Sequence, residues 1–344
     1  MANALQHKEH LTVLALESSC DETACAVVRD GVVLGERIST QIDIHRLYGG
    51  VVPEIASRNH ALNINQVVRE ALADADVTIP QVDAIAVTYG AGLIGALLVG
   101  VSYAKGLAYA YDKPLVAVNH IRGHIAANYL AHPDLRPPYV ALIVSGGHTA
   151  VAVVEDYTHL HVYGATADDA VGEAFDKVAR VLGLPYPGGP EIERLARQGK
   201  ACIPMPQAKM VGAYDFSYSG LKTAVINYVH TAEQRGESIC PADVAASFQD
   251  AAVSVLAEHA VRLAEETGIR TIAVAGGVGA NGRLREVLNN YAYPRGIKAL
   301  FPPRRFCTDN ASMIGMEALV QLRAGTPFAD LTLDAVATIP LVSH

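Results

Sequence analysis

The sequence predicts an α/β protein with two related domains. Apolar runs of about five to seven residues alternate with helical patterns over most of the chain, which is typical of sheets covered by helices. Three strand-like runs joined by short polar turns open the chain, and this pattern returns near its middle, which indicates a duplicated unit. The length of 344 residues also favours two domains, at roughly 100 to 200 residues per domain.

The first half contains a meander of three strands, followed by helices that alternate with strands. The dipeptide Asp30-Gly31 predicts the turn between the second and third strands. The predicted strands cover 11–16, 24–28, 32–38, 82–87 and 115–119, and the predicted helices cover 54–73 and 94–110. We expect a first domain over residues 1–130, joined by the C-terminal segment 325–344.

The second half repeats this order after a linker at 131–138, where three prolines oppose regular structure. The predicted strands cover 139–144, 149–154, 159–163 and 271–275. The predicted helices cover 167–182, 190–198, 219–230, 241–267, 283–291 and 308 to about 323. We expect a second domain over residues 131–324, facing the first across a cleft.

Composition and charge exclude several classes of protein. Lys and Arg number 27 against 35 Asp and Glu, so the formal net charge is −8, and any nucleic acid would have to meet a local basic patch or a partner protein. The five cysteines form no C-x-x-C pair, which favours a reducing cytosol and a cytoplasmic location. Glycines interrupt the uncharged stretch 84–104, and the N-terminus is polar, so we expect neither a membrane span nor a secretory signal.

Two histidines follow a predicted buried strand. His120 and His124 are four residues apart, which places both imidazoles on one face of a helix, where they can share a metal or can serve as a cap and a solvated side chain. Ile121 follows His120, so the H-E-x-x-H pattern of metalloproteases is absent. Asp309, at the start of a predicted helix, is the candidate third ligand; its alternative role is a helix cap.

Two glycine-rich loops predict a nucleotide site. The loop around Ser145, Gly146 and Gly147 joins two strands, where backbone N–H groups can approach a phosphate; a plain hairpin turn is the alternative. A second glycine-rich turn at 275–282 lies between a strand and a helix. The segment 90–95 matches G-x-G-x-x-G, but no acidic residue ends a following strand, which disfavours dinucleotide binding.

Carboxylates gather in a polar loop at 17–23, where they are suited to bind a cation, orient an amine or accept a proton; a solvated turn is the alternative. Asp176 lies on the flank of a predicted helix and can pair with Arg180 four residues later. The sequence Gly188-Gly189-Pro190 begins another helix, whose free N–H groups can bind a ligand beside Glu193.

Together these segments resemble one family, the TsaD proteins. These are the tRNA threonylcarbamoyladenosine synthases, long labelled O-sialoglycoprotein endopeptidases. The resemblance runs from Leu14 to about Gly325. It is carried, in order, by LESSCDET (16–23), GGVVPEIASRNH (49–60), GAGLIGALLVG (90–100), NHIRGH (119–124), VSGGHT (144–149), DDAVGEAFDKVARVLGLPYPGGP (168–190), FSYSGLKTAV (216–225), AGGVGANGRLR (275–285) and CTDNASMIG (307–315).

The resemblance implies a fold, a reaction and a cofactor. The fold would be two actin-like domains (ASKHA: actin, Hsp70 and sugar kinase) with a nucleotide-binding cleft between them. The reaction would transfer threonylcarbamoyl from threonylcarbamoyl-AMP to the exocyclic amine of the adenosine 3′ of the anticodon in tRNAs that read codons starting with A. One iron or zinc ion per subunit would be the cofactor.

The resemblance also implies roles for residues. His120, His124 and Asp309 would hold the metal, and Asp21 and Glu22 would receive the proton of the attacking amine. The nucleotide would be bound by Ile143, Val144, Ser145, Gly146 and Gly147 on its phosphate side, and by Asp176, Gly189, Glu193 and Asn281 on its adenosine side. Archaeal and eukaryotic relatives often have a metal-binding Tyr where this chain has Ile143, so the chain looks like a bacterial-type member.

Bacterial relatives work with partners, and the resemblance implies the same here. The expected partners are tRNA, a degenerate paralogue (TsaB-like), a small P-loop ATPase (TsaE-like) and the upstream enzyme that makes threonylcarbamoyl-AMP. Two alternatives remain open, a metalloprotease and an actin-like nucleotide switch or scaffold. The missing Glu after His120 opposes the first, and Glu17-Ser18-Ser19 in place of Asp-x-Gly in the first loop opposes the second.

Overall fold

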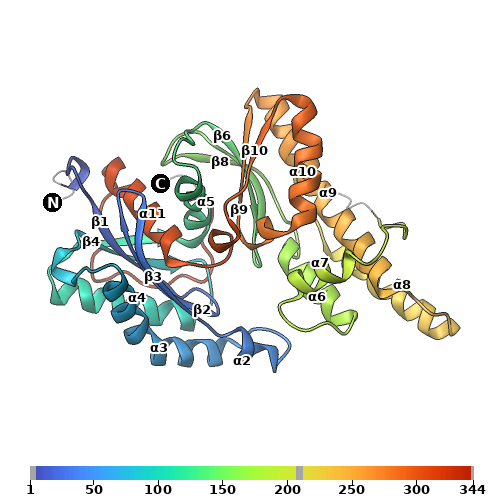
Figure 1. Cartoon of the computed structure of the whole chain (residues 1–344), viewed down its shortest axis with the longest axis horizontal. Coiled ribbons are helices and arrows are strands. Elements are labelled where there is room, and N and C mark those ends of the chain that lie inside the picture. Colours follow the sequence, from blue (N-terminus) through green and yellow to red (C-terminus); the bar gives the residue numbers. More distant parts are fainter. Residues whose placement is uncertain (1–4, 207–211, 342–344) are drawn as a thin grey trace. The chain divides into compact units, whose positions relative to one another are not determined.

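The structure is a computed structural model, and it describes residues 5–206 and 212–341. The chain forms two compact units. The first contains the chain up to Leu135, the short segment Tyr157–His159 and the chain from Thr308 onward; the second contains Arg136–Asp156 and Leu160–Cys307. Each unit is built around one five-stranded sheet (Figure 1).

The sheet of the first unit has the order β3-β2-β1-β4-β5. Its strands are β1 (Thr12–Glu17), β2 (Glu22–Arg29), β3 (Val32–Thr40), β4 (Ala84–Gly90) and β5 (Leu115–Asn119). The first three form an antiparallel meander, and β4 and β5 extend the sheet in parallel beside β1. Every residue of the central strand β1 is buried, because helices cover both of its faces, and this explains its continuous apolar run.

Helices cover both faces of this sheet. They are α2 (Ile42–Arg46), α3 (Pro53–Asp74), α4 (Ile94–Ala110), α5 (His120–Ala131) and α11 (Ala311–Ala324), with a short 3₁₀ turn η1 (Ile79–Gln81). Helices α3 and α4 pack together on one face, and α5 and α11 pack together on the other (Figure 1). The helix pair α5 and α11 carries the candidate metal ligands at its N-terminal ends.

The second sheet repeats the first. Its order is β10-β9-β6-β7-β8, from the strands β6 (Tyr139–Val144), β7 (Thr149–Val154), β8 (Leu160–Ala165), β9 (Thr271–Ala275) and β10 (Lys298–Leu300). Again three strands form an antiparallel meander, and two more lie parallel to the first of them. The predicted duplication is therefore confirmed.

The second unit has five helices among the described residues, with a core of apolar side chains between them and the sheet. They are α6 (Val171–Val181), α7 (Gly188–Ala196), α8 (Ser219–Arg235), α9 (Pro241–Thr267) and α10 (Gly282–Ala292), with 3₁₀ turns η2 (Gly277–Ala280), η3 (Tyr293–Arg295) and η4 (Arg304–Phe306). The predicted helix at 241–267 has the predicted bounds, whereas α6 begins at Val171 rather than at 167. The strand β10 and the short helix α2 were not predicted.

The helix α11 lies in the first unit, although the sequence placed residues up to 324 in the second domain. Glycines explain how closely it packs there. A Cβ added at Gly123 of α5 would lie 2.7 Å from Cδ1 of Ile314, and one added at Gly315 of α11 would lie 2.6 Å from Cγ2 of Val28. In residues 5–206 and 212–341, no helix is long and apolar enough to cross a membrane.

Candidate functional site

Helix α5 presents two buried imidazoles at its start. His120 is its first residue, directly after β5, and the side chain of Asn119 caps the helix by accepting a hydrogen bond from the backbone N–H of Ile121 at 2.9 Å. His124 lies one turn later. The exposed fractions are 7% and 1%, and the ring centroids are 4.6 Å apart. The strand–helix junction therefore brings both rings to one place, as the four-residue spacing predicted.

The third candidate ligand comes from the other end of the sequence. Asp309 precedes α11, and the cap of that helix is its neighbour Asn310, whose Oδ1 accepts a hydrogen bond from the N–H of Met313 at 2.9 Å. The carboxylate of Asp309 is thus free for another role: its Oδ1 lies 3.4 Å from Nε2 of His120 and 3.2 Å from Nε2 of His124. One ligand atom from each of the three residues lies within 4.8 Å of the others.

The chemistry of this cluster fits a metal ion. Nδ1 of His124 is buried and has no hydrogen-bond partner in the described part of the chain, and Nε2 faces only the carboxylate of Asp309. Buried polar groups left in this way are costly unless something binds them. Two imidazoles and one carboxylate are ligands that Fe²⁺ and Zn²⁺ accept in proteins. Burial lowers the pKa of the His124 imidazole, which keeps the ring neutral and able to coordinate.

A buried carboxylate stands behind the first histidine. Oε2 of Glu17 lies 3.0 Å from Nδ1 of His120, and Glu17 is 1% exposed. Thr88 donates a hydrogen bond to the same oxygen at 2.5 Å, and the backbone N–H of Ser19 donates to Oε1 at 2.5 Å. With its Nδ1 proton held by Glu17, His120 turns Nε2 toward Asp309. The sequence predicted Glu17 only as part of the acidic loop; its position at the end of a buried strand was the available signal.

Charge determines the protonation of this pair. Burial lowers the pKa of the His120 imidazole, but the carboxylates of Asp309 and Glu17 outweigh burial and raise that pKa well above its ordinary value. Burial raises the pKa of the Glu17 carboxyl, yet His120 pulls it below its ordinary value. Without a metal, His120 is therefore a cation between two anions, and their attraction holds the three side chains together.

The two predicted proton acceptors, Asp21 and Glu22, follow Glu17 closely in the chain. The connection from β1 to β2 is short, and it ends with Asp21, which is 6% exposed, and Glu22, which begins β2. Burial, followed by the charges of Asp21 and Asp309, raises the pKa of Glu22 to about 10. A carboxyl group with that pKa is protonated at neutral pH, so in the metal-free protein Glu22 is a proton donor.

In the second unit, the loop after β6 offers main-chain groups, not side chains, to a ligand. Ile143 and Val144 are fully buried residues of β6, so they offer main-chain atoms. Ser145 closes the loop: its N–H donates to the carbonyl of His148 at 2.8 Å, and its Oγ accepts from the N–H of His148 at 3.1 Å. Gly146 and Gly147 are exposed, and a Cβ at either would meet no atom within 4 Å. Their backbone faces open space, as a phosphate loop requires.

The second glycine-rich turn packs against this loop. Gly276 has φ +99°, and a Cβ there would lie 2.5 Å from the carbonyl oxygen of Val144. Gly172 of α6 approaches the loop from another side, where a Cβ would lie 2.6 Å from the carbonyl oxygen of Ser145. Three backbone segments far apart in sequence thus converge, and glycine is required where they touch.

The four residues expected on the adenosine side connect α6, α7 and α10. Asp176 of α6 accepts a hydrogen bond from the N–H of Gly188, the first residue of α7, at 2.7 Å. Gly189 faces open space. Glu193 of α7 accepts from the N–H of Gly282, the first residue of α10, at 3.2 Å. The structure therefore brings these predicted residues to one region of the second unit.

Asn281 completes this set, and its side chain is already engaged. Its Oδ1 caps α10 by accepting from the N–H of Leu284 at 3.0 Å, and its Nδ2 donates to Oε1 of Gln249 at 2.9 Å. Gln249 lies in the first third of the long helix α9 and was not singled out by the sequence, because nothing in a helical pattern marks one interior glutamine as functional.

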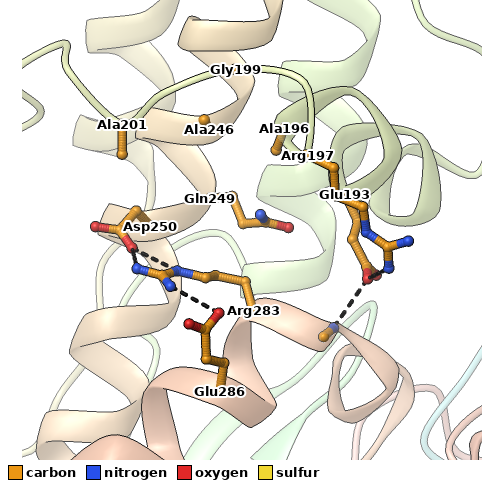
Figure 2. A pocket seen from close by; sticks show the side chains of 11 residues that line it. Glu193, Ala196, Arg197, Gly199, Ala201, Ala246, Gln249, Asp250, Arg283 and Glu286 are labelled. Atoms are coloured by element: carbon orange, nitrogen blue, oxygen red, sulfur yellow. Dashed lines mark hydrogen bonds and ion pairs between the residues drawn. The ribbon is translucent and has the colours of Figure 1, made fainter.

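A cavity of about 440 Å³ lies beside these residues (Figure 2). Its polar lining comes from Glu193 and Arg197, from Gln249 and Asp250 of α9, and from Arg283 and Glu286 of α10. Arg283 is 2.6 Å from Asp250 and 2.9 Å from Glu286, so these three charges neutralise one another in part. The volume and the mixed lining are those of a small-molecule site.

The sequence is similar to one family of known proteins over most of its length. The family model of TsaD, tRNA N6-adenosine threonylcarbamoyltransferase, matches residues 32–316. Curated relatives with that name include one from Moorella thermoacetica, 56% identical over 96% of this chain and 97% of its own length. Another, from Clostridium perfringens, is 55% identical over 96% of this chain and 98% of its own, and one from Clostridium botulinum is 50% identical over 97% and 99%.

Solved structures with low sequence identity share the fold. Full-length HypF, in a phosphate- and nucleotide-bound form, superposes with a TM-score of 0.61 at 15% identity, over 92% of this chain and 47% of its own. Component A of the (R)-2-hydroxyglutaryl-CoA dehydratase of Acidaminococcus fermentans superposes with a TM-score of 0.52 at 14% identity, over 91% and 99%. These are actin-like proteins, so the predicted actin-like α/β fold is confirmed. The matched length and identity show that this chain belongs to the TsaD family, the tRNA N6-adenosine threonylcarbamoyltransferases.

Proposed function

We propose that this chain transfers the threonylcarbamoyl group of threonylcarbamoyl-AMP to the exocyclic amine of the adenosine 3′ of the anticodon, in tRNAs that read codons starting with A. Membership of the TsaD family supports the reaction. The observation that carries the proposal is the convergence of two buried histidines, His120 and His124, with the partly buried Asp309 in the first unit. Three such groups, from β5–α5 and from the start of α11, have no need to meet in a protein that only binds nucleotide.

His120, His124 and Asp309 would hold one iron or zinc ion. A cation of this kind supplies Lewis acidity when bound, which polarises a carbonyl group such as that of the carbamoyl moiety. The role of Glu17 is to hold the proton on Nδ1 of His120, so that Nε2 remains available at the ligand position.

The second unit would bind the nucleotide. The backbone at Gly146 and Gly147 is suited to the phosphate, because a Cβ at either position would meet only open space and no side chain hinders a ligand there. Asp176 and Glu193 offer carboxylate oxygens near the N-terminal turns of α7 and α10, where hydroxyl groups of a ribose can donate. Ile143 and Val144 contribute through their main chain, since their side chains are in the core.

The transfer forms a C–N bond and breaks a C–O bond. The amine nitrogen attacks the carbamoyl carbon, the bond from that carbon to the phosphate oxygen breaks, and AMP leaves with the electron pair. One proton leaves the amine, and we assign its capture to Asp21. Glu22 would stay protonated beside it, since its raised pKa of about 10 opposes a role as base at neutral pH.

Partners and location complete the proposal. We propose that the chain works in the cytoplasm on tRNA, with a degenerate paralogue, a small P-loop ATPase and an upstream enzyme that supplies threonylcarbamoyl-AMP. The net charge of −8 supports a need for partners. Three exposed arginines of the second unit are paired with glutamates: Arg194 with Glu191, Arg197 with Glu193 and Arg295 with Glu265. A protein partner would then supply part of the tRNA-binding surface.

The two alternatives have less support. A zinc protease of the H-E-x-x-H type needs a carboxylate next to its first histidine, and that position holds Ile121, which is 1% exposed. A nucleotide switch or scaffold does not explain the histidine cluster in the first unit.

The test is a transfer assay with purified components. Radiolabelled threonylcarbamoyl-AMP is given to the chain with its partners and an unmodified tRNA that reads a codon starting with A. We expect label on that tRNA and none on a matched tRNA whose adenosine next to the anticodon is replaced by guanosine. Label on both tRNAs, or on neither while a known family member succeeds in parallel, would refute the proposal.

A further inference from the structure

The cavity in the second unit contains one polar group that its neighbours do not satisfy. The charged residues around it are paired among themselves, as Arg283 is with Asp250 and Glu286. Gln249 is different: it is 6% exposed, it lines the cavity, and Figure 2 shows its amide group among the lining residues, with Asp250 and Arg283 on one side and Glu193 on the other.

The orientation of the Gln249 amide follows from a backbone group. The N–H of Leu284 can only donate, so the atom of Asn281 that meets it, at 3.0 Å, must be the oxygen Oδ1. The other amide atom of Asn281 is then Nδ2, which can only donate. It lies 2.9 Å from Gln249, which must therefore present its oxygen Oε1. The amide nitrogen Nε2 of Gln249 is left with its N–H groups for another partner.

No residue of the described chain accepts a hydrogen bond from this nitrogen. Oε1 of Glu193, a predicted ligand-binding oxygen in the same lining, is engaged by the N–H of Gly282 at 3.2 Å and by Arg197 at 2.5 Å. The amide nitrogen of Gln249 therefore lines the cavity as a donor that no group in the described part of the chain uses, and a ligand that brings an acceptor there gains a hydrogen bond. A cavity of about 440 Å³ has room for a nucleobase.

We propose that Gln249 is a specificity-determining residue, whose Nε2 donates a hydrogen bond to a ring nitrogen of the adenine of the nucleotide. This inference rests on the proposed function, which brings adenosine beside Glu193 and Asn281. The ring nitrogens N1, N3 and N7 of adenine are all acceptors, so a donor fixed in the cavity matches the base. Asn281 then acts as a positioning residue: it caps α10 and holds the Gln249 amide in the orientation that reads the base.

The test removes the two partners of this hydrogen bond one at a time. Binding of AMP to the full-length protein is measured by calorimetry and compared with 1-deaza-, 3-deaza- and 7-deaza-AMP, each of which lacks one ring acceptor. For the wild type we expect one of the three analogues to bind about tenfold more weakly than AMP. In Gln249→Met, AMP itself should bind about tenfold more weakly, and the difference between AMP and that analogue should disappear.

Two further variants make the test specific. Gln198→Met makes the same change at an exposed glutamine just after α7 that does not line the cavity, and it should retain wild-type affinities within about twofold. Asn281→Asp keeps the cap oxygen of α10 but replaces the donor that orients Gln249, so it should lose the discrimination while the fold is retained.

The inference is overturned if Gln249→Met, folded by circular dichroism, still discriminates against the same analogue, or if the wild type binds all three analogues as tightly as AMP. Loss of discrimination in Asn281→Asp alone would show that Asn281 contacts the base directly. If the wild type does not bind AMP, the nucleotide site of the proposed function fails, and this inference fails with it.

Discussion

The candidate metal cluster of the first unit and the glycine-rich loops of the second, called the seat below, are built in opposite ways. The cluster is made of charged side chains that already hold one another, with His120 between the carboxylates of Glu17 and Asp309. The seat is made of backbone, with Gly146, Gly147 and Gly189 facing open space. The cluster depends on the charges of its side chains, and the seat depends on the absence of side chains at its glycines.

This difference teaches how each region fails. A cluster of buried charges loses its function when one member is changed, since the remaining members are left unpaired. A seat made of glycine backbone tolerates an added side chain at its open positions, but not where two segments touch. The predictions below separate these two behaviours.

Loss of a ligand should have the largest effect. In His124→Ala we expect transfer activity to fall more than about a hundredfold, since even the outer partners of metal ligands are worth 10- to 100-fold. Bound metal, measured by mass spectrometry of the purified protein, should fall with it. AMP binding, which we propose for the second unit, should remain within about twofold of wild type. An active His124→Ala enzyme with full metal content would contradict the assignment.

A methyl group at the contact between the glycine-rich segments should damage the second unit. Gly276→Ala places a Cβ 2.5 Å from the carbonyl oxygen of Val144 at a φ of +99°. We expect the free energy of unfolding in urea to fall by about 2 to 4 kcal/mol. The control is Gly147→Ala, where the Cβ meets open space, with a change of less than about 1 kcal/mol. Equal losses in the two variants would show that close approach is not what requires glycine at 276.

The carboxylate of Glu17, which contacts His120, should strengthen metal binding by the cluster. Glu17→Gln keeps the shape but removes the charge that holds the Nδ1 proton. We expect the affinity for Zn²⁺, measured by competition with a chelating dye, to fall about 10- to 100-fold. A matched control is Glu54→Gln, an exposed residue of the same unit that pairs with Arg58, for which no change is expected. An unchanged zinc affinity in Glu17→Gln would show that Glu17 is only structural.

The smallest effect is a dependence on pH. The pKa of the metal-free His120 imidazole is raised, so its proton must leave before the ring can coordinate. Below that pKa, metal affinity should rise about tenfold per pH unit, and binding should release about one proton. Calorimetry in buffers of different ionisation enthalpy measures that proton. AMP binding should change little between about pH 7 and 8.5, because no imidazole is among the residues proposed to bind it. Metal binding without proton release would contradict the proposed charge state.

The sequence predicted the duplicated meanders well, because each strand shows its period locally. It predicted the interior of long elements such as 241–267, but it began two helices too early, at 167 and 308 instead of Val171 and Ala311. The N–H of Val171 is bound by the hydroxyl of Thr149, 22 positions away, which no local pattern shows. It also assigned α11 to the second domain. The partners of α11, Val28 and Gly123, lie far away in sequence, so no local pattern could show that it packs in the first unit.

The candidate site divides in the same way. The sequence predicted His120 and His124 as metal ligands from their spacing. It predicted Asp309 from its place at the start of a helix and from the resemblance to the family. The contact of Glu17 with His120 and that of Gln249 with Asn281 were not readable, because they join residues 103 and 32 positions apart. Buried hydrogen-bond partners of this kind appear only when the fold is known.

The most direct test of the account is transfer by metal-stripped enzyme. The chain is treated with a chelator, assayed with its partners for threonylcarbamoyl transfer to unmodified tRNA, and assayed again after one equivalent of Fe²⁺ or Zn²⁺ is added. The account predicts loss of transfer on stripping and recovery with one of the two ions, in the wild type but not in His124→Ala. Undiminished transfer by the stripped enzyme would contradict it.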